Sequence, residues 1–367
     1  MELNHMGKDL SYDIVVVGAG PAGSTTARFA AEAGASVLVL ERRAQVGVPV
    51  RCGELMPDLN EMRNIFPAAG DMSDIFEVPS DLVSLKFDTI RIFSPKNTRY
   101  EVPFAGYTTH RDRLDQFFAS QAVKAGAEIL TGQKVTKVGP GKVSTDDLSI
   151  NAKVIVGADG PLSLVGKAFG LGRSADLCPA ITVQVSGEFE PVPEMYFGTV
   201  APGGYAWVIP KKGCANVGLG VSRKFAKMTV GEYFDGFVKF RGLDVGKPEG
   251  KVVPMSMPVK RTVSGQAMIV GDAAGQVMAV NGGGIPIARI TGKVAGTVAA
   301  ANVLKGTPLS DYEAEWRRQI YRPLRTAAHT KVLAELCFGS VWRTEAAMKV
   351  LGPRRMNNLI RCRPILP

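Results

Sequence analysis

Residues 12–41 read YDIVVVGAGPAGSTTARFAAEAGASVLVLE, and this stretch decides the fold. Asp13–Val17 and Val37–Leu40 are short runs of apolar, mostly β-branched residues, which is typical of buried strands. Ser24–Ala33 is rich in alanine and is followed by Gly34, so it predicts a helix that stops at the glycine. The order of strand, glycine-rich turn, helix and strand predicts a βαβ unit that binds a dinucleotide.

The turn between the first strand and the helix has the spacing GxGxxG. Gly18 permits the tight turn, Gly20 lets a pyrophosphate approach the backbone, and Gly23 lets helix and strand pack closely. The pyrophosphate would meet the helix N-terminus, where backbone N–H groups are free. Glu41 stands at the end of the second strand, 18 positions after Gly23, and is predicted to hold a ribose hydroxyl. Together with Ala22, these residues form the first predicted part of the cofactor site.

The bulk composition is that of an ordinary globular protein. The chain has 367 residues, of which 46% are hydrophobic and 21% are charged. Its net charge of +10 favours acidic protein partners, anionic membrane surfaces or nucleic acid. No zinc-finger, RNP-type or basic-zipper pattern is present, so we predict no nucleic-acid partner.

The N-terminal segment and the cysteines bear on the cellular compartment. Met1–Ser11 is polar and has no apolar signal core, and no stretch of about 18 uncharged apolar residues follows. The five cysteines are odd in number and form no CxxC pair, which argues against a disulfide framework or a structural metal site. We therefore predict a cytoplasmic protein with no bound metal.

The strand and helix patterns along the chain predict a discontinuous fold. Short alternating runs separated by turn residues dominate Ala180–Pro258, which predicts an antiparallel sheet. The predicted class is α/β: a discontinuous Rossmann-like dinucleotide-binding domain, an inserted antiparallel β-sheet substrate domain and a short helical C-terminal region. The predicted boundaries are 1–79, 106–176 and 258–308 for the dinucleotide-binding domain, 80–105 and 177–257 for the β-rich domain, and 309–367 for the C-terminal region. That last region is basic, because Asp311 to the end has 11 Lys/Arg against 5 Asp/Glu.

A second cofactor motif follows the apolar run Ala267–Val270. Asp272 comes directly after this predicted strand, where the carboxyl ends of strands in α/β sheets bind ligands. Its carboxylate could accept hydrogen bonds from a ribityl chain. Gly282–Gly284 would let the backbone pass close to a flat ring, and the helix predicted from Ile285 would direct its positive end at that ring. These features point to a flavin.

The motifs occur in the order found in FAD-dependent oxidoreductases of the p-hydroxybenzoate hydroxylase-like group. They are the fingerprint, Arg-Asp-Arg at 111–113, Ala-Asp-Gly at 158–160, and Gly-Asp at 271–272. Within that group the chain resembles the geranylgeranyl reductase family, over roughly residues 13–304. The more specific pieces are PVRCGE at 49–54 and PGGYAWVIPK at 202–211. Ile209 stands in the second piece where that family usually has phenylalanine.

The resemblance implies FAD as the cofactor and assigns residues to it. Glu41 would hold the adenosine ribose, and Val135 would meet the adenine through its backbone. Asp272 would bind the ribityl chain, and Gly284 and Ile285 would present N–H groups to the flavin ring. The remaining implied cofactor residues are Arg51, Cys52, Glu54, Arg111 and Asp159.

Two further features bear on substrate and catalysis. Tyr205, Trp207 and Ile209 alternate along a predicted strand and therefore share one face. That face could wall a tunnel for an apolar polyprenyl chain, or it could be ordinary sheet core. Cys52 could gate the flavin face or help to deliver a proton, or it could be a small buried apolar residue. Tyr205 is the second candidate proton donor.

The resemblance implies reduction of isolated double bonds in geranylgeranyl chains by hydride transfer from reduced flavin. The implied substrates are archaeal-type ether-lipid precursors or geranylgeranyl diphosphate, and the electron donor would be NAD(P)H or an acidic carrier such as ferredoxin. A flavin monooxygenase acting on an aromatic or polyketide substrate uses the same scaffold and is the alternative enzyme. A non-catalytic, membrane-docked flavoprotein that only carries electrons is the alternative of a different class.

The basic C-terminal region raises the hypothesis of peripheral contact with the inner face of the membrane. Four arginines recur at intervals that mostly keep them on one side of a predicted helix. They are Arg317, Arg318, Arg322 and Arg325. The alternative is a solvated basic face that packs on the FAD-binding domain.

Overall fold

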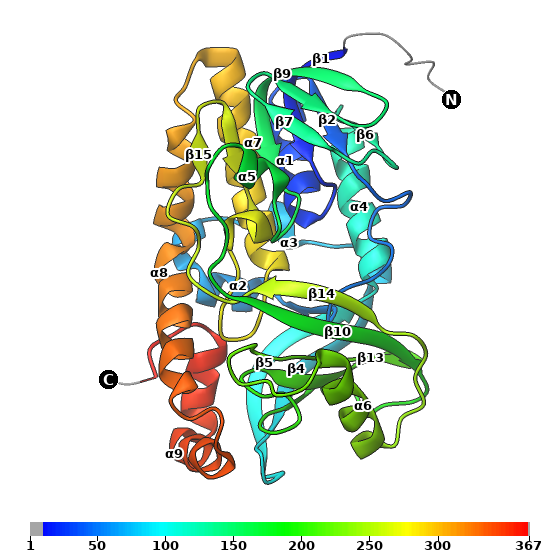
Figure 1. Ribbon diagram of the computed structural model, residues 1–367, viewed down its shortest axis with the longest axis vertical. Coiled ribbons are helices and arrows are strands. Elements are labelled where there is room, and N and C mark those ends of the chain that lie inside the picture. The colour runs from blue at the N-terminus through cyan, green and yellow to red at the C-terminus, as the bar shows by residue number, and fades with distance from the viewer. Residues whose placement is uncertain (1–9, 366–367) are drawn as a thin grey trace.

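The computed structural model describes residues 10–365, which form two β-sheets flanked by helices (Figure 1). Most of Met1–Ser11, on which the predicted location partly rests, lies outside the described residues. Sheet A has the order β15-β16-β9-β1-β2-β6, and the β7-β8 hairpin is attached to β9. Its strands are β1 (Leu10–Val17), β2 (Val37–Leu40), β6 (Glu128–Leu130), β7 (Lys137–Gly139), β8 (Lys142–Ser144), β9 (Ser149–Gly157), β15 (Val263–Ser264) and β16 (Ala267–Ile269).

The pairings in sheet A confirm the Rossmann-like class. β1 pairs in parallel with β2 and with β9, and β16 pairs in parallel with β9. Helix α1 (Pro21–Glu32) connects β1 and β2 as predicted, but it begins at Pro21 rather than Ser24. The earlier start has a simple cause: proline is already set for the first helical turn, where its missing N–H is not needed. Gly34 lies in the turn after α1 and has a φ of +95°, a conformation that favours glycine.

Helices cover both faces of sheet A. One face packs on α1, α4 (Arg111–Lys124) and α7 (Ile285–Lys305), and joins Val16, Ala27 and Ile287 in one buried cluster. The other face packs on α5 (Leu164–Ala168), where Val15 and Val165 belong to a second cluster. Because both faces are covered, the central parts of the parallel strands, residues 14–17 of β1 and 37–40 of β2, are continuous apolar runs rather than alternating ones.

Sheet B has the order β14-β10-β13-β12-β11-β4-β5-β3. Its strands are β3 (Leu55–Pro57), β4 (Val83–Phe93), β5 (Arg99–Thr109), β10 (Leu177–Ser186), β11 (Glu194–Tyr196), β12 (Tyr205–Lys211), β13 (Cys214–Gly220) and β14 (Glu249–Pro254). The pairings are antiparallel except for β11 with β4, which is parallel. The short strand β3 lies within the segment 1–79 and pairs with β5.

One face of sheet B is closed by α6 (Val230–Arg241). This helix starts with a capping box in which Thr229 and Glu232 satisfy each other's backbone N–H groups. Phe234 and Phe237 pack with Val208 and its neighbours on that face. The opposite face, which carries the other alternating residues of β12, is therefore the one left to line a binding site.

The C-terminal helices connect the two sheets. Helix α8 (Ser310–Glu335) runs along one long side of the molecule, and α9 (Val341–Ile360) folds back beside sheet B (Figure 1). Helix α8 is fixed to sheet A by Trp316 Nε1, which donates to Thr262 Oγ1 at 3.0 Å. Helix α9 kinks at Gly352, where φ is +58°. The remaining helices are α2 (Leu59–Ile65) and α3 (Ser73–Phe76), with 3₁₀ turns η1 (Pro67–Ala69), η2 (Ser80–Leu82) and η3 (Gly271–Ala274).

None of the helices in residues 10–365 is long and apolar enough to cross a membrane.

Candidate active site

A large cavity of about 1350 Å³ lies where the two sheets and the C-terminal helices meet. The glycine-rich turn, the loop 47–55, strand β12, the segment 278–286 and the last helices all contribute lining residues. Pockets for one drug-sized ligand usually measure ~300–1,000 Å³. The cavity is therefore large enough for a dinucleotide together with part of a second ligand.

The three fingerprint glycines differ in the space around them. Gly18 has a φ of +100°, and a Cβ there would stand 2.5 Å from the Ala158 carbonyl oxygen. A Cβ at Gly23 would stand 1.8 Å from the Gly18 carbonyl oxygen, so only glycine lets α1 pack so closely. A Cβ at Gly20 would meet nothing within 4 Å, because this glycine borders the cavity at the N-terminus of α1. Space beside free helix N–H groups is suited to a pyrophosphate.

The two predicted carboxylates on the sheet A side differ in their surroundings. Glu41 accepts the Ala19 N–H at 2.9 Å and the Arg43 N–H at 3.0 Å, which fixes its carboxylate at the cavity wall. Asp159 accepts from Ser163 Oγ and the Leu164 N–H, each at 2.6 Å, and so caps the start of α5. Burial raises the pKa of Asp159. Both residues line the cavity, and both carboxylates already accept two hydrogen bonds or more from the protein.

The second cofactor motif forms the opposite part of the cavity wall. Asp272 lies in η3 with an oxygen 3.8 Å from Lys251 Nζ, and both residues line the cavity. A Cβ at Gly284 would stand 2.9 Å from Asp272 Oδ1, so glycine is needed for this close approach. Ile285 starts the 21-residue helix α7, and no side chain caps it. The free N–H groups and positive end of α7 therefore lie at the cavity, suited to an electron-rich ring edge.

Arg51 and Val135, two further predicted cofactor residues, also line the cavity. Arg51 pairs with Glu249 of β14 at 3.2 Å. Val135 lies in the loop before β7. Arg111 is held by a bidentate contact with Asp115, with its Nη2 2.7 Å from Oδ2.

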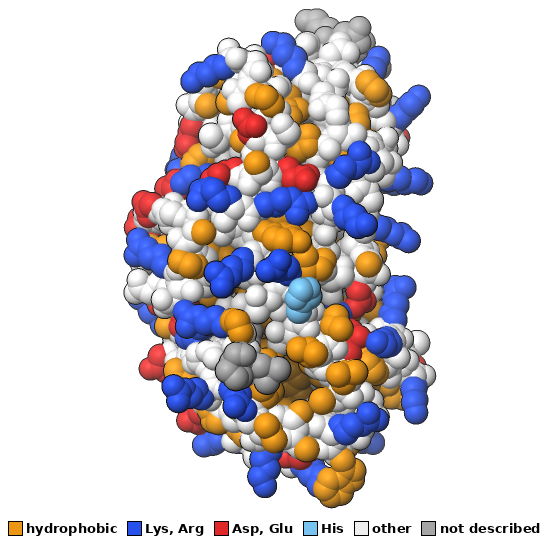
Figure 2. All heavy atoms as spheres, turned by 90° about the vertical axis from the view of Figure 1, so that its left-hand side faces the viewer, with side chains coloured by type: hydrophobic (Ala, Val, Ile, Leu, Met, Phe, Trp, Pro, Cys, Tyr) orange, Lys and Arg blue, Asp and Glu red, His pale blue; other side chains and the backbone are white. Residues whose placement is uncertain are grey.

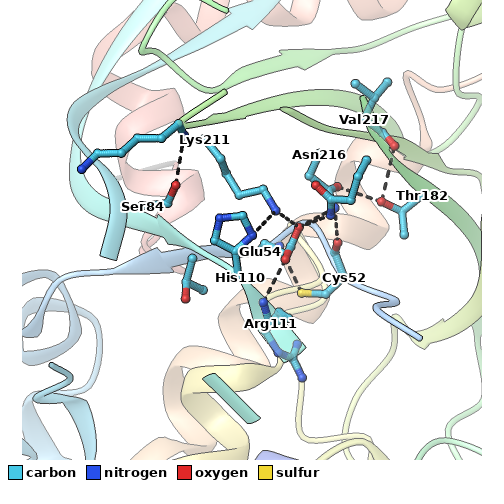
Figure 3. A network of polar contacts seen from close by, with 12 residues as sticks. Cys52, Glu54, Ser84, His110, Arg111, Thr182, Lys211, Asn216 and Val217 are labelled. Carbon is cyan, nitrogen blue, oxygen red and sulfur yellow. Dashed lines mark hydrogen bonds and ion pairs between the residues drawn. The ribbon is translucent and has the colours of Figure 1, made fainter. Parts of the chain in front are cut away.

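The loop that carries Cys52 is held in place by a buried polar network (Figure 3). Its centre is Glu54, which has a φ of +63° and a side chain only 1% exposed. The carboxylate accepts from Lys211 Nζ at 2.7 Å, from Asn216 Nδ2 at 2.9 Å and from the Arg111 N–H at 2.9 Å. Gln184 also donates to it. The resemblance implied a cofactor role for Glu54, and the residue lines the cavity, while its oxygens accept hydrogen bonds from these protein donors.

Asn216 extends the Glu54 network to the cavity wall. Its Nδ2 donates to the Cys52 carbonyl oxygen at 2.8 Å, and its Oδ1 accepts from Trp207 Nε1 at 2.8 Å. Thr182 donates to the same Oδ1 at 2.8 Å. The backbone of the Cys52 loop and the indole of Trp207 are thus fixed by one side chain.

His110 lies at the outer edge of the network. Its Nδ1 is 3.4 Å from Lys211 Nζ, and Figure 3 shows the imidazole directed at that ammonium group. Burial and the positive charge of Lys211 lower the pKa of His110. A neutral imidazole can accept a hydrogen bond from the lysine, whereas a charged imidazole would repel it.

Cys52 itself faces the cavity. The thiol sulfur accepts the Glu54 N–H at 3.2 Å, and the residue is partly exposed. Gly53 follows, and a Cβ there would stand 3.1 Å from Ile209 Cδ1. The loop therefore lies directly against the predicted aromatic face of β12.

The alternation predicted for β12 is confirmed. Tyr205, Trp207 and Ile209 all line the cavity, while Ala206 and Val208 belong to the cluster under α6. The Tyr205 and Trp207 ring centroids are 5.8 Å apart. The Tyr205 hydroxyl donates to the Asn281 carbonyl oxygen, and burial raises the pKa of Tyr205. Gly218 leaves the room that the indole fills, because a Cβ there would stand 2.4 Å from Trp207 Cζ2.

The cavity continues beyond β12 into an apolar arm between α8 and α9. Its lining residues there include Ala334, Cys337, Phe338, Ala347, Met348, Leu351, Leu359 and Ile360. The sequence predicted contact with a membrane, or packing on the FAD-binding domain, for this region, but it did not predict that the region lines the cavity. The apolar residues within 333–360 are the sequence signal for this wall of the cavity. Helical periodicity shows that a helix has an apolar face, but it does not show which other element that face packs against.

Comparison with known proteins shows to which of the flavoprotein families with this fold the chain belongs. The model of the geranylgeranyl reductase catalytic domain matches residues 178–256, and that of the NAD(P)-binding Rossmann-like domain matches residues 16–66. Digeranylgeranylglycerophospholipid reductase 2 of Methanothermobacter thermautotrophicus is 36% identical over 355 residues, covering 88% of each chain. The corresponding reductase of Methanocaldococcus jannaschii is 32% identical, covering 89% of this chain and 87% of its own. The chain belongs to the geranylgeranyl reductase family.

Solved structures agree with the family assignment. A geranylgeranyl bacteriochlorophyll reductase-like protein from Thermoplasma acidophilum superposes with a TM-score of 0.77 at 26% identity, covering 89% of this chain and 88% of its own. A flavin-dependent brominase reaches a TM-score of 0.71 at only 17% identity, covering 96% of this chain and 93% of its own, which is a likeness of fold alone. This member of the geranylgeranyl reductase family is therefore an oxidoreductase on a flavoprotein scaffold, as the sequence motifs indicated.

Proposed function

We propose that this protein is an FAD-dependent reductase that saturates isolated double bonds of geranylgeranyl chains in archaeal-type ether-lipid precursors or geranylgeranyl diphosphate. One observation carries the proposal: the dinucleotide turn and the Tyr205–Trp207–Ile209 face line the same cavity, which continues into an apolar arm. The test is incubation of the purified protein with a reductant and a geranylgeranyl lipid, followed by mass analysis. The product should gain the mass of molecular hydrogen for each double bond reduced.

The cavity residues fit FAD as the cofactor. Open space at Gly20 would take the pyrophosphate at the start of α1, and the free N–H groups at the start of α7 would meet the ring. When bound and reduced, FAD supplies the hydride. The residues proposed to hold it are Gly18, Gly20, Ala22, Gly23, Glu41, Arg51, Cys52, Arg111, Val135, Asp272, Gly284 and Ile285. Glu54 and Asp159 would act mainly by holding the Cys52 loop and the start of α5.

An unactivated alkene has to be held dry and at close range for reduction. The apolar face of β12 and the arm between α8 and α9 offer such an environment for a polyprenyl chain. Trp207 is held in one orientation by Asn216 and by the space at Gly218, so it can serve as a fixed wall. We propose Tyr205, Trp207 and Ile209 as substrate-binding residues.

Replacement of Trp207 by alanine is expected to reduce kcat/KM on long geranylgeranyl chains by roughly ten- to a hundredfold, since a large apolar contact is lost. Short prenyl substrates that do not reach the wall should be affected much less. Flavin content, read from visible absorbance, should stay at the wild-type level, which separates a substrate effect from a loss of cofactor. Equal losses on short and long chains would count against a tunnel along β12.

Saturation of the alkene also needs a proton, for which Cys52 and Tyr205 are the two candidates. Both line the cavity, and the hydroxyl of Tyr205 is protonated at neutral pH, because burial raises the pKa of Tyr205 above its already high ordinary value. Loss of the group that donates the proton should lower kcat by about a hundredfold or more. Comparison of Cys52→Ala with Tyr205→Phe at matched flavin content identifies the donor. If neither variant slows turnover, the proton comes from elsewhere.

The remaining parts of the proposal concern partners and organisation. The reductant would be NAD(P)H or an acidic carrier such as ferredoxin, which the net charge of +10 would attract. The protein would work in the cytoplasm and contact the inner face of the membrane, where its substrate resides. We propose that 1–79, 106–176 and 258–308 act as the FAD-binding domain and 80–105 and 177–257 as the substrate domain.

A further inference from the structure

Apolar side chains are concentrated on the surface where α8 ends and α9 begins. Of the large hydrophobic residues that are exposed in the described chain, five fall within residues 332–350. They are Val332, Leu333, Leu336, Trp342 and Val350, with exposed fractions of 61%, 48%, 69%, 73% and 71%. An exposed cluster of this kind on a globular protein marks an interaction surface. We call these five residues the apolar patch.

The apolar patch is continuous with the cavity. Leu333 and Val350 are exposed and also line the cavity, and Cys337, Phe338 and Ala347 line it from the same two helices. Figure 2 shows hydrophobic side chains gathered around a hollow in the lower half of the molecule, over the C-terminal helices. The patch therefore borders an entrance that leads between α8 and α9 toward β12.

The charges around the patch are mostly positive. Residues 332–355 contain four Lys/Arg and two Asp/Glu. Arg343, Lys349, Arg354 and Arg355 are exposed. Of the two acidic residues, Glu335 is paired with Lys224 at 2.7 Å and with Lys331 at 3.5 Å. The other, Glu345, accepts the Lys96 N–H at 3.0 Å and the Thr98 hydroxyl at 3.1 Å, so its carboxylate is engaged by the β4–β5 turn. A basic rim around an apolar centre complements an anionic lipid surface.

The first half of α8, where the sequence suggested membrane contact, is different. Arg317 pairs with Glu313 at 3.2 Å and donates to the Lys260 carbonyl oxygen at 2.6 Å. Arg318 pairs with Glu315 at 2.6 Å. Two of the four arginines proposed for lipid contact are thus already engaged within the protein.

The helices that carry the patch are anchored on either side of it. Arg361, just after α9, forms a buried ion pair with Glu61 of α2. Lys331 of α8 pairs with Asp176 and donates to the Met255 carbonyl oxygen at 2.8 Å. The exposed apolar residues between these two ion pairs therefore lie on helices that are fixed to the rest of the protein.

We propose that the apolar patch is the surface by which the protein docks on an anionic bilayer, and that a lipid chain passes from the bilayer between α8 and α9 into the cavity. This inference rests on the proposed function, because it takes a bilayer-resident polyprenyl lipid as the occupant of the cavity. The patch would enter the interfacial layer while the basic rim contacts lipid phosphates.

The test uses the whole protein and vesicles that contain no substrate. Trp342 reports on docking, because Trp207 and Trp316 are buried and the exposed indole should shift its emission to the blue on entering lipid. The test variant is Val332→Gln with Leu336→Gln; neither residue lines the cavity. The matched control is Val123→Gln with Met228→Gln, two exposed apolar residues outside the patch. Circular dichroism checks that all of the variants fold.

We expect wild type and control to bind vesicles of anionic lipid and to bind zwitterionic vesicles more weakly. The patch variant should bind anionic vesicles at least roughly tenfold more weakly than the control, without the shift in emission. Absent binding by wild type, or equal binding by the patch variant and the control, would overturn the proposal. So would binding that is lost only when Arg317, Arg318, Arg322 and Arg325 are changed to glutamine.

Vesicle binding is measured without turnover, so the two proposals can fail separately. If the protein reduces a detergent-dispersed lipid but does not bind vesicles, the docking proposal is wrong and the proposed reductase function stands. Docking through the patch by a protein that reduces no polyprenyl lipid would remove the proposed function instead.

Discussion

The Gly20→Val variant is expected to fold like wild type and to be purified without flavin. The backbone at Gly20 has φ −71° and ψ −176°, an extended conformation that valine adopts without strain. Its side chain would enter open space in the protein, but this is the space that the pyrophosphate needs. Visible absorbance before and after incubation with FAD gives the flavin content, and circular dichroism gives the fold.

Gly23→Val is the matched control for the same loop. Its side chain would collide with the Gly18 carbonyl oxygen, so this variant should be unstable rather than folded and colourless. A yellow Gly20→Val protein with wild-type flavin content would show that the pyrophosphate does not lie at this turn. A colourless wild type that FAD cannot reconstitute would remove the cofactor proposal altogether.

Replacement of Lys211 by methionine is expected to lower the free energy of unfolding by about 3–5 kcal/mol. Lys211 and Glu54 are each 1% exposed, so the substitution leaves a buried carboxylate without its counter-charge. The loss should be partly restored in the double variant with Glu54→Gln, because the second change removes the uncompensated charge. Denaturant unfolding of the single and double variants measures both effects.

Lys224→Met is the matched control, because it breaks an ion pair of the same N–O distance at the protein surface instead of in the interior. Lys224 and Glu335 are also 2.7 Å apart, but the lysine side chain is 65% exposed. The expected change in unfolding free energy is therefore within about 1 kcal/mol. If the two lysine variants were equally stable, the Glu54 network would not be the element that fixes the Cys52 loop.

The cofactor half of the site could be predicted because its residues are local in sequence. The turn at Gly18–Gly23, the acid Glu41 and the segment around Asp272 each follow an apolar strand directly. Their positions relative to the strand are fixed by the short turn that follows it, so the sequence spacing alone predicts where they lie. The common face of Tyr205, Trp207 and Ile209 is equally local, because it depends only on strand alternation.

The Glu54 network could not be predicted in the same way. Asn216 lies opposite Ile209 in the β12–β13 register, and Thr182 lies opposite Gly218 in the β10–β13 register. A shift of one residue in either register would turn these side chains to the α6 face. The sequence contains the polar residues but not the register that brings them to one carboxylate.

The fold alone does not separate reductase from monooxygenase. A probable FAD-dependent monooxygenase from Pseudomonas aeruginosa superposes on 92% of this chain with a TM-score of 0.67 at 14% identity. Family membership favours the reductase, and the apolar arm between α8 and α9 suits a long chain better than a small aromatic ring. The distinction therefore rests on which molecule accepts the electrons.

The most direct test of the reductase proposal is the reoxidation of flavin without oxygen. The FAD-loaded protein is reduced chemically under anaerobic conditions and then mixed with a digeranylgeranyl ether lipid dispersed in detergent. The proposal predicts that the absorbance of oxidised flavin returns as the lipid becomes saturated, and that a fully saturated lipid has no effect. Flavin that stays reduced with every polyprenyl lipid, and is reoxidised only when oxygen or a protein acceptor is added, would contradict it.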